Sequence, residues 1–430
     1  MPILIKPTLA CNFQCDYCYE HALRAGGQRP YDLDKVEETV RCNHQRGQGV
    51  TLHGGEITLL PLPDLERLLK LNGELDKHSS IQTNAYALTD EHFELFAKYK
   101  TSVGVSIDGP WPLNRYRGFG SREQRQAQTA QVMENIRRLR ELGISVSVIS
   151  VITHLHIESP DLYWSWVLDL RDMGIVSGRM NYVQRIEGFD NAHASEDDFA
   201  AFYVQMAERY YQYPDLQWQP FRDVVDNLLG LGLGTCVFTK CDPYSTSSAF
   251  VVDGQGETHS CLRTGQDGKC YLRAPTGEMR YECLRQTPQE YGGCKGCRWW
   301  KVCFGSCPSV SINGDWRNRG DYCAVWKALY EYVERRLKGL MPNLHLVTED
   351  EPEEYEERKQ GIGERTFAAM IRRGGSSWRA SARCGSKPSQ KPNQKPGTWE
   401  KVSYSDAHGY LVDLGNGYKH ADHSDTGRTG

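Results

Sequence analysis

The sequence predicts an α/β protein with a mostly parallel sheet, followed by a small cysteine-rich module. Stretches with strand and helix patterns alternate six times between residues 2 and 212. Such alternation is typical of a parallel sheet with helices on its outside. Ten of the fifteen cysteines then fall between residues 236 and 323, which predicts a separate module with metal or redox chemistry.

Buried apolar runs and helical spacing of apolar residues place the six units. Strands are expected at residues 2–7, 49–55, 80–85, 101–108, 144–153 and 178–184. Helices are expected at residues 62–71, 89–99, 128–142, 159–173 and 195–212. Ser159 or Pro160 is expected to begin the fourth helix, and a capping box of Ser195 and Asp198 the fifth. Because sites in such sheets lie at the C-terminal strand ends, motifs at those ends are the functional candidates.

Three cysteines follow the first strand in "CNFQCDYC": Cys11, Cys15 and Cys18. We see no signal peptide and no run of about 18 apolar residues, so a cytoplasmic protein with reduced thiols is expected. Zinc is one alternative, but zinc sites usually pair two short hooks of two ligands each. Three thiolates from one loop favour an iron–sulfur cube with one open iron.

The spacing C-x3-C-x2-C, with Tyr17 before the last cysteine, resembles the cluster loop of radical S-adenosylmethionine (SAM) enzymes. The resemblance implies a partial (β/α)6 TIM-like barrel, with the three cysteines as catalytic ligands of a 4Fe–4S cluster. In that family the open iron binds SAM, and an electron from the cluster splits SAM to a 5′-deoxyadenosyl radical that abstracts hydrogen. We therefore also expect an electron donor of flavodoxin or ferredoxin type as a partner.

The segment "HGGE", residues 53–56, ends the second expected strand. Gly54, Gly55 and Glu56 match the motif with which the family holds the methionyl amino group of SAM. Glycine at such a place lets backbone approach a ligand closely, although an ordinary strand-to-helix turn is the alternative. Arg117 or Arg122 is expected near the SAM carboxylate, and the sequence does not choose between them.

Polar residues also end the third and fourth expected strands. Ser106 and Asp108, in "SIDG", are two residues apart and should share a face of the strand. They resemble the ribose-binding pair of the family. Asn84, in "QTNA", is a weaker candidate for cofactor binding, because Ala85 stands where the family often has glycine.

Seven later cysteines form a second motif. Their order is Cys241, then Cys261 at the end of a G-x4-C element, then C-x2-C-x5-C-x3-C, then Cys323. This order resembles the SPASM extension of radical SAM enzymes, which carries two auxiliary 4Fe–4S clusters; a zinc ribbon is the alternative for its C-x2-C part. The resemblance assigns to the outer cluster Cys294, Cys297, Cys303 and Cys323. It assigns to the inner cluster Cys241, Cys261 and Cys307, with Cys236 as a fourth ligand or else an open iron.

Four segments follow from these motifs. We expect the radical SAM barrel at residues 1–225 and the SPASM module at 226–342, ending in a helix. A charged and low-complexity linker follows at 343–397, rich in Pro and Lys near its end. Residues 398–430 are expected to form a small tail, either a β-hairpin or disordered.

The resemblance implies an oxidoreductase that abstracts hydrogen from a peptide side chain and crosslinks or oxidises it, as in ribosomal peptide maturation. The alternative is oxidation of a small molecule by a SPASM-type dehydrogenase; a cluster-bearing scaffold without catalysis is disfavoured because the cofactor motifs are intact. The expected partner is a precursor peptide. No leader-binding domain precedes Cys11, so a separate leader-binding protein, the tail or the barrel would recognise the leader. The net charge of −4 gives no general attraction to nucleic acid.

One position bears on the product. Formylglycine-generating members of the family place an Asp directly after the cysteine of the G-x4-C element, where it acts as a base. Here that position is Leu262, followed by Arg263, and a leucine takes no proton. We therefore expect crosslinking rather than aldehyde formation, unless another carboxylate such as Asp253 reaches the site.

Overall fold

All described helices and strands lie in one compact unit, residues 1–384; the chain has a second unit at 385–430. The structure is a computed structural model that describes residues 3–21, 24, 27, 29–45, 48–75, 79–184, 193–231, 250–259, 261, 279–315 and 317–349. The expected linker after residue 349, the expected tail, Cys236, Cys241 and Leu262 lie outside these residues.

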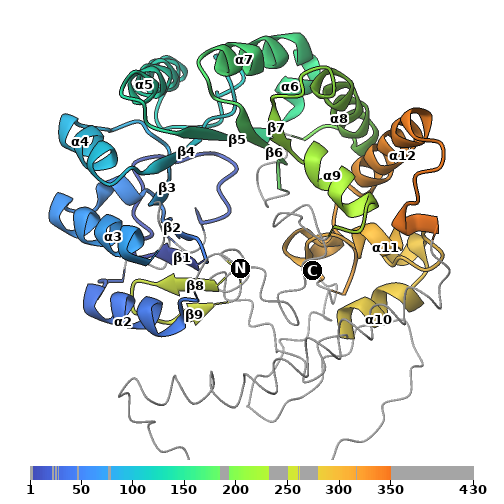
Figure 1. The fold of residues 1–430 in the computed structure, drawn as a ribbon, viewed down its shortest axis with the longest axis horizontal. Helices are drawn as coiled ribbons and strands as arrows, with labels where there is room; N and C mark the ends of the chain where they lie inside the picture. The colour runs from blue at the N-terminus through green and yellow to red at the C-terminus, as the bar shows by residue number, and fades with distance from the viewer. Residues whose placement is uncertain are drawn as a thin grey trace, which may run out of the picture. The chain divides into compact units, whose positions relative to one another are not determined.

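A nine-stranded sheet forms the centre of the unit (Figure 1), in the order β7-β6-β5-β4-β3-β2-β1-β8-β9. Its strands are β1 Ile3–Lys6, β2 Val50–Leu52, β3 Ser80–Thr83, β4 Ser102–Ser106, β5 Val146–Ile152, β6 Ser177–Tyr182, β7 Gln217–Gln219, β8 Phe250–Asp253 and β9 Thr258–His259. All neighbouring pairs are parallel except β8 with β9. The predicted α/β class with a partial barrel is therefore confirmed.

Helices cover the outer face of this sheet. Figure 1 shows α2, α3, α4, α5 and α7 on the outer side of the strands. The helices are α2 Leu33–Asn43, α3 Leu62–Leu75, α4 Asp90–Lys98, α5 Arg122–Glu141, α6 His154–Glu158, α7 Pro160–Asp172, α8 Glu196–Tyr210, α9 Phe221–Leu228, α10 Met279–Gln286, α11 Trp300–Cys303 and α12 Cys323–Leu340. Each of the five helices predicted from apolar spacing is present.

Local sequence explains where these helices begin. Ser121 and Gln124 form a capping box at the start of α5, and Pro160 occupies the first turn of α7 after the N-cap Ser159. At α8 the Ser195 side chain accepts a hydrogen bond from the Asp198 N–H, as predicted. The Asp198 carboxylate accepts from the Ser195 hydroxyl rather than from the Ser195 N–H, so the reciprocal half of the predicted capping box is absent.

Strand register brings the apolar residues of the sheet to one face. Ile5 lies opposite Leu52 on one side and Val252 on the other, and all three side chains are fully buried. In β5, buried and partly buried residues alternate along all seven positions. The second face of β5 is therefore only partly buried, and it carries one serine and two aliphatic residues.

The sheet continues past the six predicted units. β8 pairs with β1 in parallel, and β9 returns beside β8. These strands come from residues 250–259, beyond the boundary predicted at residue 225, so the cysteine-rich half of the chain contributes to the barrel sheet. The strand β7 and the helix α9 were also not predicted.

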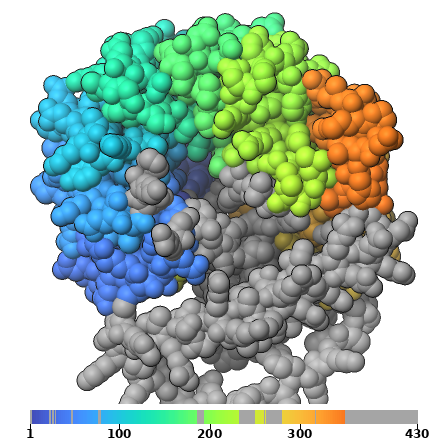
Figure 2. All heavy atoms as spheres, in the orientation of Figure 1, coloured from blue at the N-terminus to red at the C-terminus, as the bar shows by residue number. Residues whose placement is uncertain are grey.

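The helix α12 packs on α8 and α9. Figure 2 shows its atoms, in orange, directly beside the yellow-green atoms of that region. Tyr322, which precedes α12, stacks against Tyr182 with ring centroids 4.5 Å apart, and its hydroxyl donates to the Val183 carbonyl at 2.8 Å. The last cysteine of the module therefore follows a residue that is anchored on β6.

Among the described residues, no helix combines the length and the apolar character needed to cross a bilayer.

Candidate active site

The loop that carries Cys11, Cys15 and Cys18 leaves the C-terminal end of β1. Its backbone is fixed by hydrogen bonds from the Gln14 N–H to Gly118 O (3.0 Å) and from the Asp16 N–H to Tyr116 O (2.9 Å). The two carboxylate oxygens of Asp16 accept from the Arg125 guanidinium at 2.7 and 2.8 Å. A bidentate pair of this kind holds both partners in one orientation. The loop is thus fastened to the β4–α5 connection before any ligand binds.

The three thiols of this loop lie in a setting that favours a metal. Burial raises the pKa of Cys11 to about 11, and burial also raises the pKa of Cys18. The nearby Arg24 acts in the opposite direction on both thiols. Thiolates are the metal-binding form of cysteine, and buried thiolates need positive charge beside them. Iron ions would supply that charge.

The distances between cysteine sulfur atoms distinguish a site for a single metal ion from a site for a cluster. Zinc–sulfur bonds of about 2.3 Å place tetrahedral thiolates about 3.8 Å apart. Within the described residues, the only three ligand atoms that all lie within 4.8 Å of one another belong to Asp253, Glu257 and His259. No three described cysteine sulfurs lie that close, in the loop or in the cysteine-rich region. The ligands of a multi-iron cluster attach to different metal atoms, so a cluster does not need three sulfurs that close.

The segment 53–56 follows β2 directly and lies against the cluster loop. A Cβ atom on Gly55 would lie 2.3 Å from Leu9 O and 2.4 Å from Ala10 O. The Gly55 N–H donates to Thr8 O at 2.9 Å, and the Glu56 N–H donates to Ala10 O at 2.7 Å. Glycine is therefore required here by the close approach of the cluster loop, whereas the sequence predicted an approach of the ligand.

The Glu56 carboxylate, 1% exposed, connects β2 to β3. One oxygen accepts from the Thr58 N–H (3.1 Å), the Thr58 hydroxyl (2.8 Å) and the Thr83 hydroxyl (2.6 Å). The other accepts from the Asn84 N–H at 2.6 Å. The next residue, Ala85, has φ 54°, the left-handed region that favours glycine. Four donors within the protein therefore already surround the carboxylate that the sequence assigned to SAM.

The Asn84 side chain reaches the cluster loop. Its Nδ2 donates to Asn12 Oδ1 at 2.7 Å and lies 4.0 Å from the Cys11 sulfur. Its Oδ1 accepts from the Tyr86 N–H at 3.0 Å. Of the polar residues predicted at the strand ends, Asn84 is the one placed beside a cluster cysteine.

Ser106 and Asp108, predicted as a pair, have different surroundings. The Ser106 hydroxyl, at the end of β4, accepts from Gln82 Nε2 at 2.8 Å. Asp108 is fully buried beyond the strand; it accepts from the Val151 N–H at 2.9 Å and from the Tyr17 hydroxyl of the cluster loop. Burial raises the pKa of the Asp108 carboxyl. The two side chains are thus held by different neighbours, and Asp108 supports the cluster loop.

Of the two candidate arginines, only Arg117 lies beside the cluster loop. Its Nη1 donates to the Tyr17 hydroxyl at 3.0 Å and lies 3.7 Å from Asp108 Oδ1. Arg122 is exposed at the start of α5, with its guanidinium carbon 5.8 Å from the Trp111 ring centroid. Of the two candidates, Arg117 is therefore the one that the structure places beside the cluster loop.

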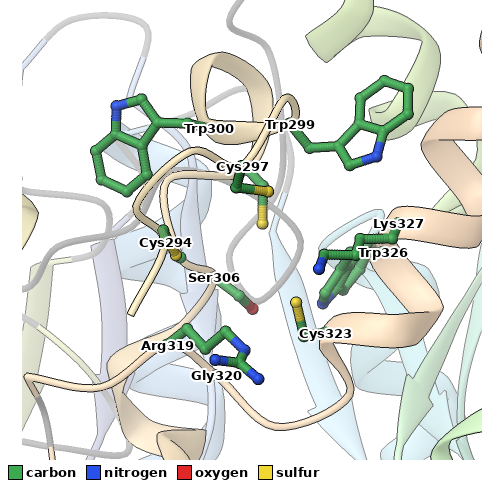
Figure 3. A pocket seen from close by; sticks show the side chains of 12 residues that line it. Cys294, Cys297, Trp299, Trp300, Ser306, Arg319, Gly320, Cys323, Trp326 and Lys327 are labelled. Carbon is green, nitrogen blue, oxygen red and sulfur yellow. The ribbon is translucent and has the colours of Figure 1, made fainter. Parts of the chain in front are cut away.

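The cysteine-rich region encloses a cavity (Figure 3). Its lining includes the four cysteines assigned by resemblance to the outer cluster: Cys294, Cys297, Cys303 and Cys323. Burial raises the pKa of Cys294 to about 12, and burial followed by the other three thiols raises the pKa of Cys303 still further. Thiolates in one buried cavity repel one another and need positive charge beside them. The iron ions of an iron–sulfur cluster provide that charge.

The residues assigned to the inner cluster are only partly described. Cys261 and Cys307 are buried, and the Cys307 sulfur lies 3.0 Å from the Ser309 hydroxyl. Neither lines the cavity of Figure 3. Of the described cysteines in the SPASM motif, the lining of this cavity contains only the four assigned to the outer cluster.

The adjacent tryptophans have packing contacts on opposite sides of the cavity. Trp299 stacks on Tyr330 at 5.6 Å between centroids, and Trp300 meets Tyr281 edge to face at 5.9 Å. Figure 3 shows the two indoles directed away from each other. Both tryptophans therefore pack against aromatic side chains of the cysteine-rich region and of α12.

A model of the Radical SAM superfamily matches residues 5–164. This range contains the cluster loop and the strand ends described above. The barrel is thus a radical SAM domain. The chain is accordingly a radical SAM enzyme that uses SAM and a 4Fe–4S cluster.

Curated relatives of this radical SAM enzyme include two kinds of maturase. An anaerobic sulfatase-maturating enzyme of serine type from Bacteroides thetaiotaomicron is 24% identical over 77% of this chain and 88% of the relative. One of cysteine type from Clostridium perfringens is 22% identical over 80% of this chain and 99% of the relative. An uncharacterized protein from Methanothermobacter thermautotrophicus is 31% identical over 39% of this chain, which spans 63% of that relative.

Solved structures share the fold of this radical SAM enzyme. The structure of anSMEcpe with bound AdoMet and the Cp18Cys peptide has a TM-score of 0.63, with 20% identity over 80% of this chain and 99% of that chain. SuiB from Streptococcus suis, bound to the precursor peptide SuiA, has a TM-score of 0.51, with 18% identity over 75% of each chain. The cysteine-rich C-terminal region is part of the likeness to the first of these structures.

Sequence reasoning missed several residues that shape the site of this radical SAM enzyme. Lys6, at the end of β1, forms a buried ion pair of 2.5 Å with Glu20, just beyond the cluster loop. A lysine that ends an otherwise apolar strand was the available signal. Asp253 was named from the sequence as an alternative carboxylate, but its place opposite Lys6 on β8 was not predicted. It accepts from the Gln255 and Glu257 N–H groups and contacts His259 Nε2 at 3.1 Å. Burial acts against ionisation of Asp253, but these hydrogen bonds outweigh it and lower the pKa of the carboxyl.

Proposed function

We propose that this radical SAM enzyme modifies a peptide, abstracting hydrogen from a side chain and crosslinking or oxidising the residue. The observation that carries the proposal is a cavity lined by four cysteines, on the same compact unit as the radical SAM barrel. Oxidation of a side chain leaves an electron to remove after the hydrogen atom has gone. Auxiliary clusters can receive that electron. The fold is also shared with proteins whose structures contain peptides.

In the barrel, residues of the cluster loop would hold the cluster, and residues near the strand ends would contact SAM. Cys11, Cys15 and Cys18 would hold a 4Fe–4S cluster, which supplies the electron that cleaves SAM to the 5′-deoxyadenosyl radical. Asn84, 4.0 Å from the Cys11 sulfur, would orient polar groups beside the cluster. Arg117 would offer its guanidinium to the SAM carboxylate. Gly54, Gly55 and Glu56 would shape the backbone around the methionyl amino group, and Ser106 and Asp108 would act on the ribose side.

In the cysteine-rich region, Cys294, Cys297, Cys303 and Cys323 would hold an outer 4Fe–4S cluster. Cys236, Cys241, Cys261 and Cys307 would hold an inner one, which makes three clusters in all. The partners would be a precursor peptide, a separate leader-binding protein and a flavodoxin or ferredoxin.

Crosslinking is the product we propose. Aldehyde formation needs a base placed to remove a proton from the oxidised side chain. Position 262, where formylglycine-generating members have an Asp, is leucine. The lowered pKa of Asp253 makes that nearby carboxylate a weak base. In crosslinking, a second side chain of the substrate completes the bond. Oxidation of a small molecule is the alternative function. The two functions differ in the substrate, which is a precursor peptide only in the first.

The test is anaerobic turnover of a short peptide encoded beside the gene for this chain. Reconstituted enzyme, dithionite, SAM and the peptide would be incubated, and the peptide analysed by mass spectrometry. We expect a loss of two hydrogens and a fragmentation gap that spans the linked residues. The variant in which the three cluster-loop cysteines are Ala is the control and should leave the peptide unchanged. A product that reacts with a hydrazine probe would contradict crosslinking, and turnover of small alcohols alone would contradict the peptide assignment.

A further inference from the structure

The outer cavity contains cations and hydrogen-bond donors as well as cysteines. Ser306, Arg319 and Lys327 all line it (Figure 3). Ser306 lies in the turn after α11, Arg319 in the loop that leads to α12, and Lys327 on α12 one turn beyond Cys323. Three separate segments therefore converge on the space between the four sulfurs.

Two of these side chains have buried donors that the described protein leaves without a partner. Ser306 is 5% exposed, and its hydroxyl has no hydrogen bond among the described residues. Arg319 Nε is likewise buried and without a partner there. A Cβ on Gly320 would lie 3.0 Å from the Ser306 hydroxyl, so glycine at 320 makes room for that side chain. Buried donors are nearly always satisfied, so these two require an acceptor within the cavity.

The two cations have no carboxylate partner among the described residues. Arg319 Nη1 donates to the carbonyls of Gln289 (2.5 Å) and Gly293 (3.3 Å). Lys327 Nζ donates to the side-chain oxygen of Gln289 at 2.7 Å. These acceptors are neutral, so both positive charges remain available to the cavity.

We propose that Ser306, Arg319 and Lys327 raise the reduction potential of the iron–sulfur cluster held by Cys294, Cys297, Cys303 and Cys323. The inference rests on the proposed function, which places a cluster in this cavity. Reduction adds one negative charge to such a cluster. Hydrogen bonds to its sulfurs and nearby positive charge stabilise the more negative state, so the cluster accepts an electron more readily. The outer cluster is thereby suited to take the electron that side-chain oxidation releases.

The experiment is a redox titration of the full, reconstituted chain with dithionite and mediator dyes, followed by electron paramagnetic resonance. The outer cluster is identified as the reduced signal that disappears in Cys303→Ala. Lys327→Met should shift its equilibrium about tenfold toward the oxidised form, the size expected for unit charges about 10 Å apart at an effective dielectric near 20. Tenfold corresponds to a fall of about 59 mV for a one-electron couple. Ser306→Ala should lower the potential by less.

Matched variants separate charge from structure. Arg319→Gln should lower the potential more than Arg319→Lys, which keeps the charge. Arg298→Gln is the control, because Arg298 lies over the Trp299 ring at 4.3 Å, pairs with Glu334 and does not line the cavity. It should leave the potential unchanged. Arg319 also donates to two backbone carbonyls, so its variants could lose iron for structural reasons. Iron content is therefore measured for every variant. If the Arg319 variants lose iron, Lys327→Met and Ser306→Ala alone test the effect on the potential.

The outcomes distinguish this inference from the proposed function. Full iron content with an unchanged potential in both Lys327→Met and Ser306→Ala would overturn the inference and leave the clusters in place. A wild-type chain without any signal that depends on Cys303 would overturn both.

Discussion

Replacing Glu56 by Ala should open the connection between β2 and β3 as well as weaken SAM binding. The sequence motif assigns this residue to the cofactor, yet its carboxylate accepts four hydrogen bonds inside the protein. Hydrogen bonds to a charged acceptor contribute about 1.5–3 kcal/mol each. The Ala variant leaves buried donors at Thr58, Thr83 and Asn84 without an acceptor. We therefore expect a local loss of stability that a residue devoted only to ligand binding would not produce.

Amide hydrogen exchange measures this loss at the groups concerned. The Thr58 and Asn84 N–H groups both donate to Glu56. Loss of about 1.5–3 kcal/mol at either amide corresponds to exchange roughly ten to more than a hundred times faster, where local opening governs exchange. Peptides that cover residues 56–60 and 82–86 would report the change in the protein without SAM. Cofactor affinity would be measured in parallel by equilibrium binding.

Glu66→Ala is the matched control. Glu66 lies on α3, where its carboxylate pairs with Lys98 at 2.7 Å near the surface. Exposed pairs of this kind contribute about 0–1 kcal/mol, so exchange in the two peptides should not change. Unchanged exchange in Glu56→Ala together with weaker SAM binding would refute the structural role and leave Glu56 as a ligand contact alone.

Three further predictions test the rest of the site. Replacing all three cluster-loop cysteines by Ala should remove about four of about twelve irons per chain and abolish SAM cleavage; full iron content would contradict the assignment. Gly55→Ala should displace the cluster loop and lower iron content by a similar amount, whereas Gly73→Ala, with nothing within 4 Å of the added carbon, should not. Burial lowers the pKa of His156 to about 4. The unfolded chain therefore binds a proton that the folded chain does not, and stability should fall by up to about 3 kcal/mol as pH drops from 6.5 to 4. A His156→Gln variant that showed the same fall in acid denaturation would contradict this.

The barrel strands could be predicted because their signal is local. β5 alternates buried and partly buried residues over its whole length, and the spacing of apolar residues in α3 and α4 is helical. β8 carries no comparable signal. It has only three apolar residues followed by Asp253, and what makes this segment a strand is the pairing with β1 far away in the chain.

At the site, residue types were predictable but their partners were not. Cysteine spacing indicated the cluster loop, and the family resemblance grouped the four cysteines that line one cavity. The sequence predicted a close approach at Gly55, but it did not predict that the cluster loop is the segment that approaches. Ser306, Arg319 and Lys327 meet only because a turn, a loop and a helix fold together, so no spacing in the sequence could group them.

The pairing of β1 with β8 has a consequence for how the chain is made. β1 leaves the ribosome long before β8, and the edge that pairs with β8 stays open until residues 250–253 have been synthesised. At about 5–20 residues per second, that delay is roughly 12–50 seconds. An unpaired edge exposes N–H and C=O groups to other chains, so the nascent chain is most prone to aggregation in this interval. Slower translation before residue 250 should therefore lower the soluble yield, whereas a delay after residue 259 should not.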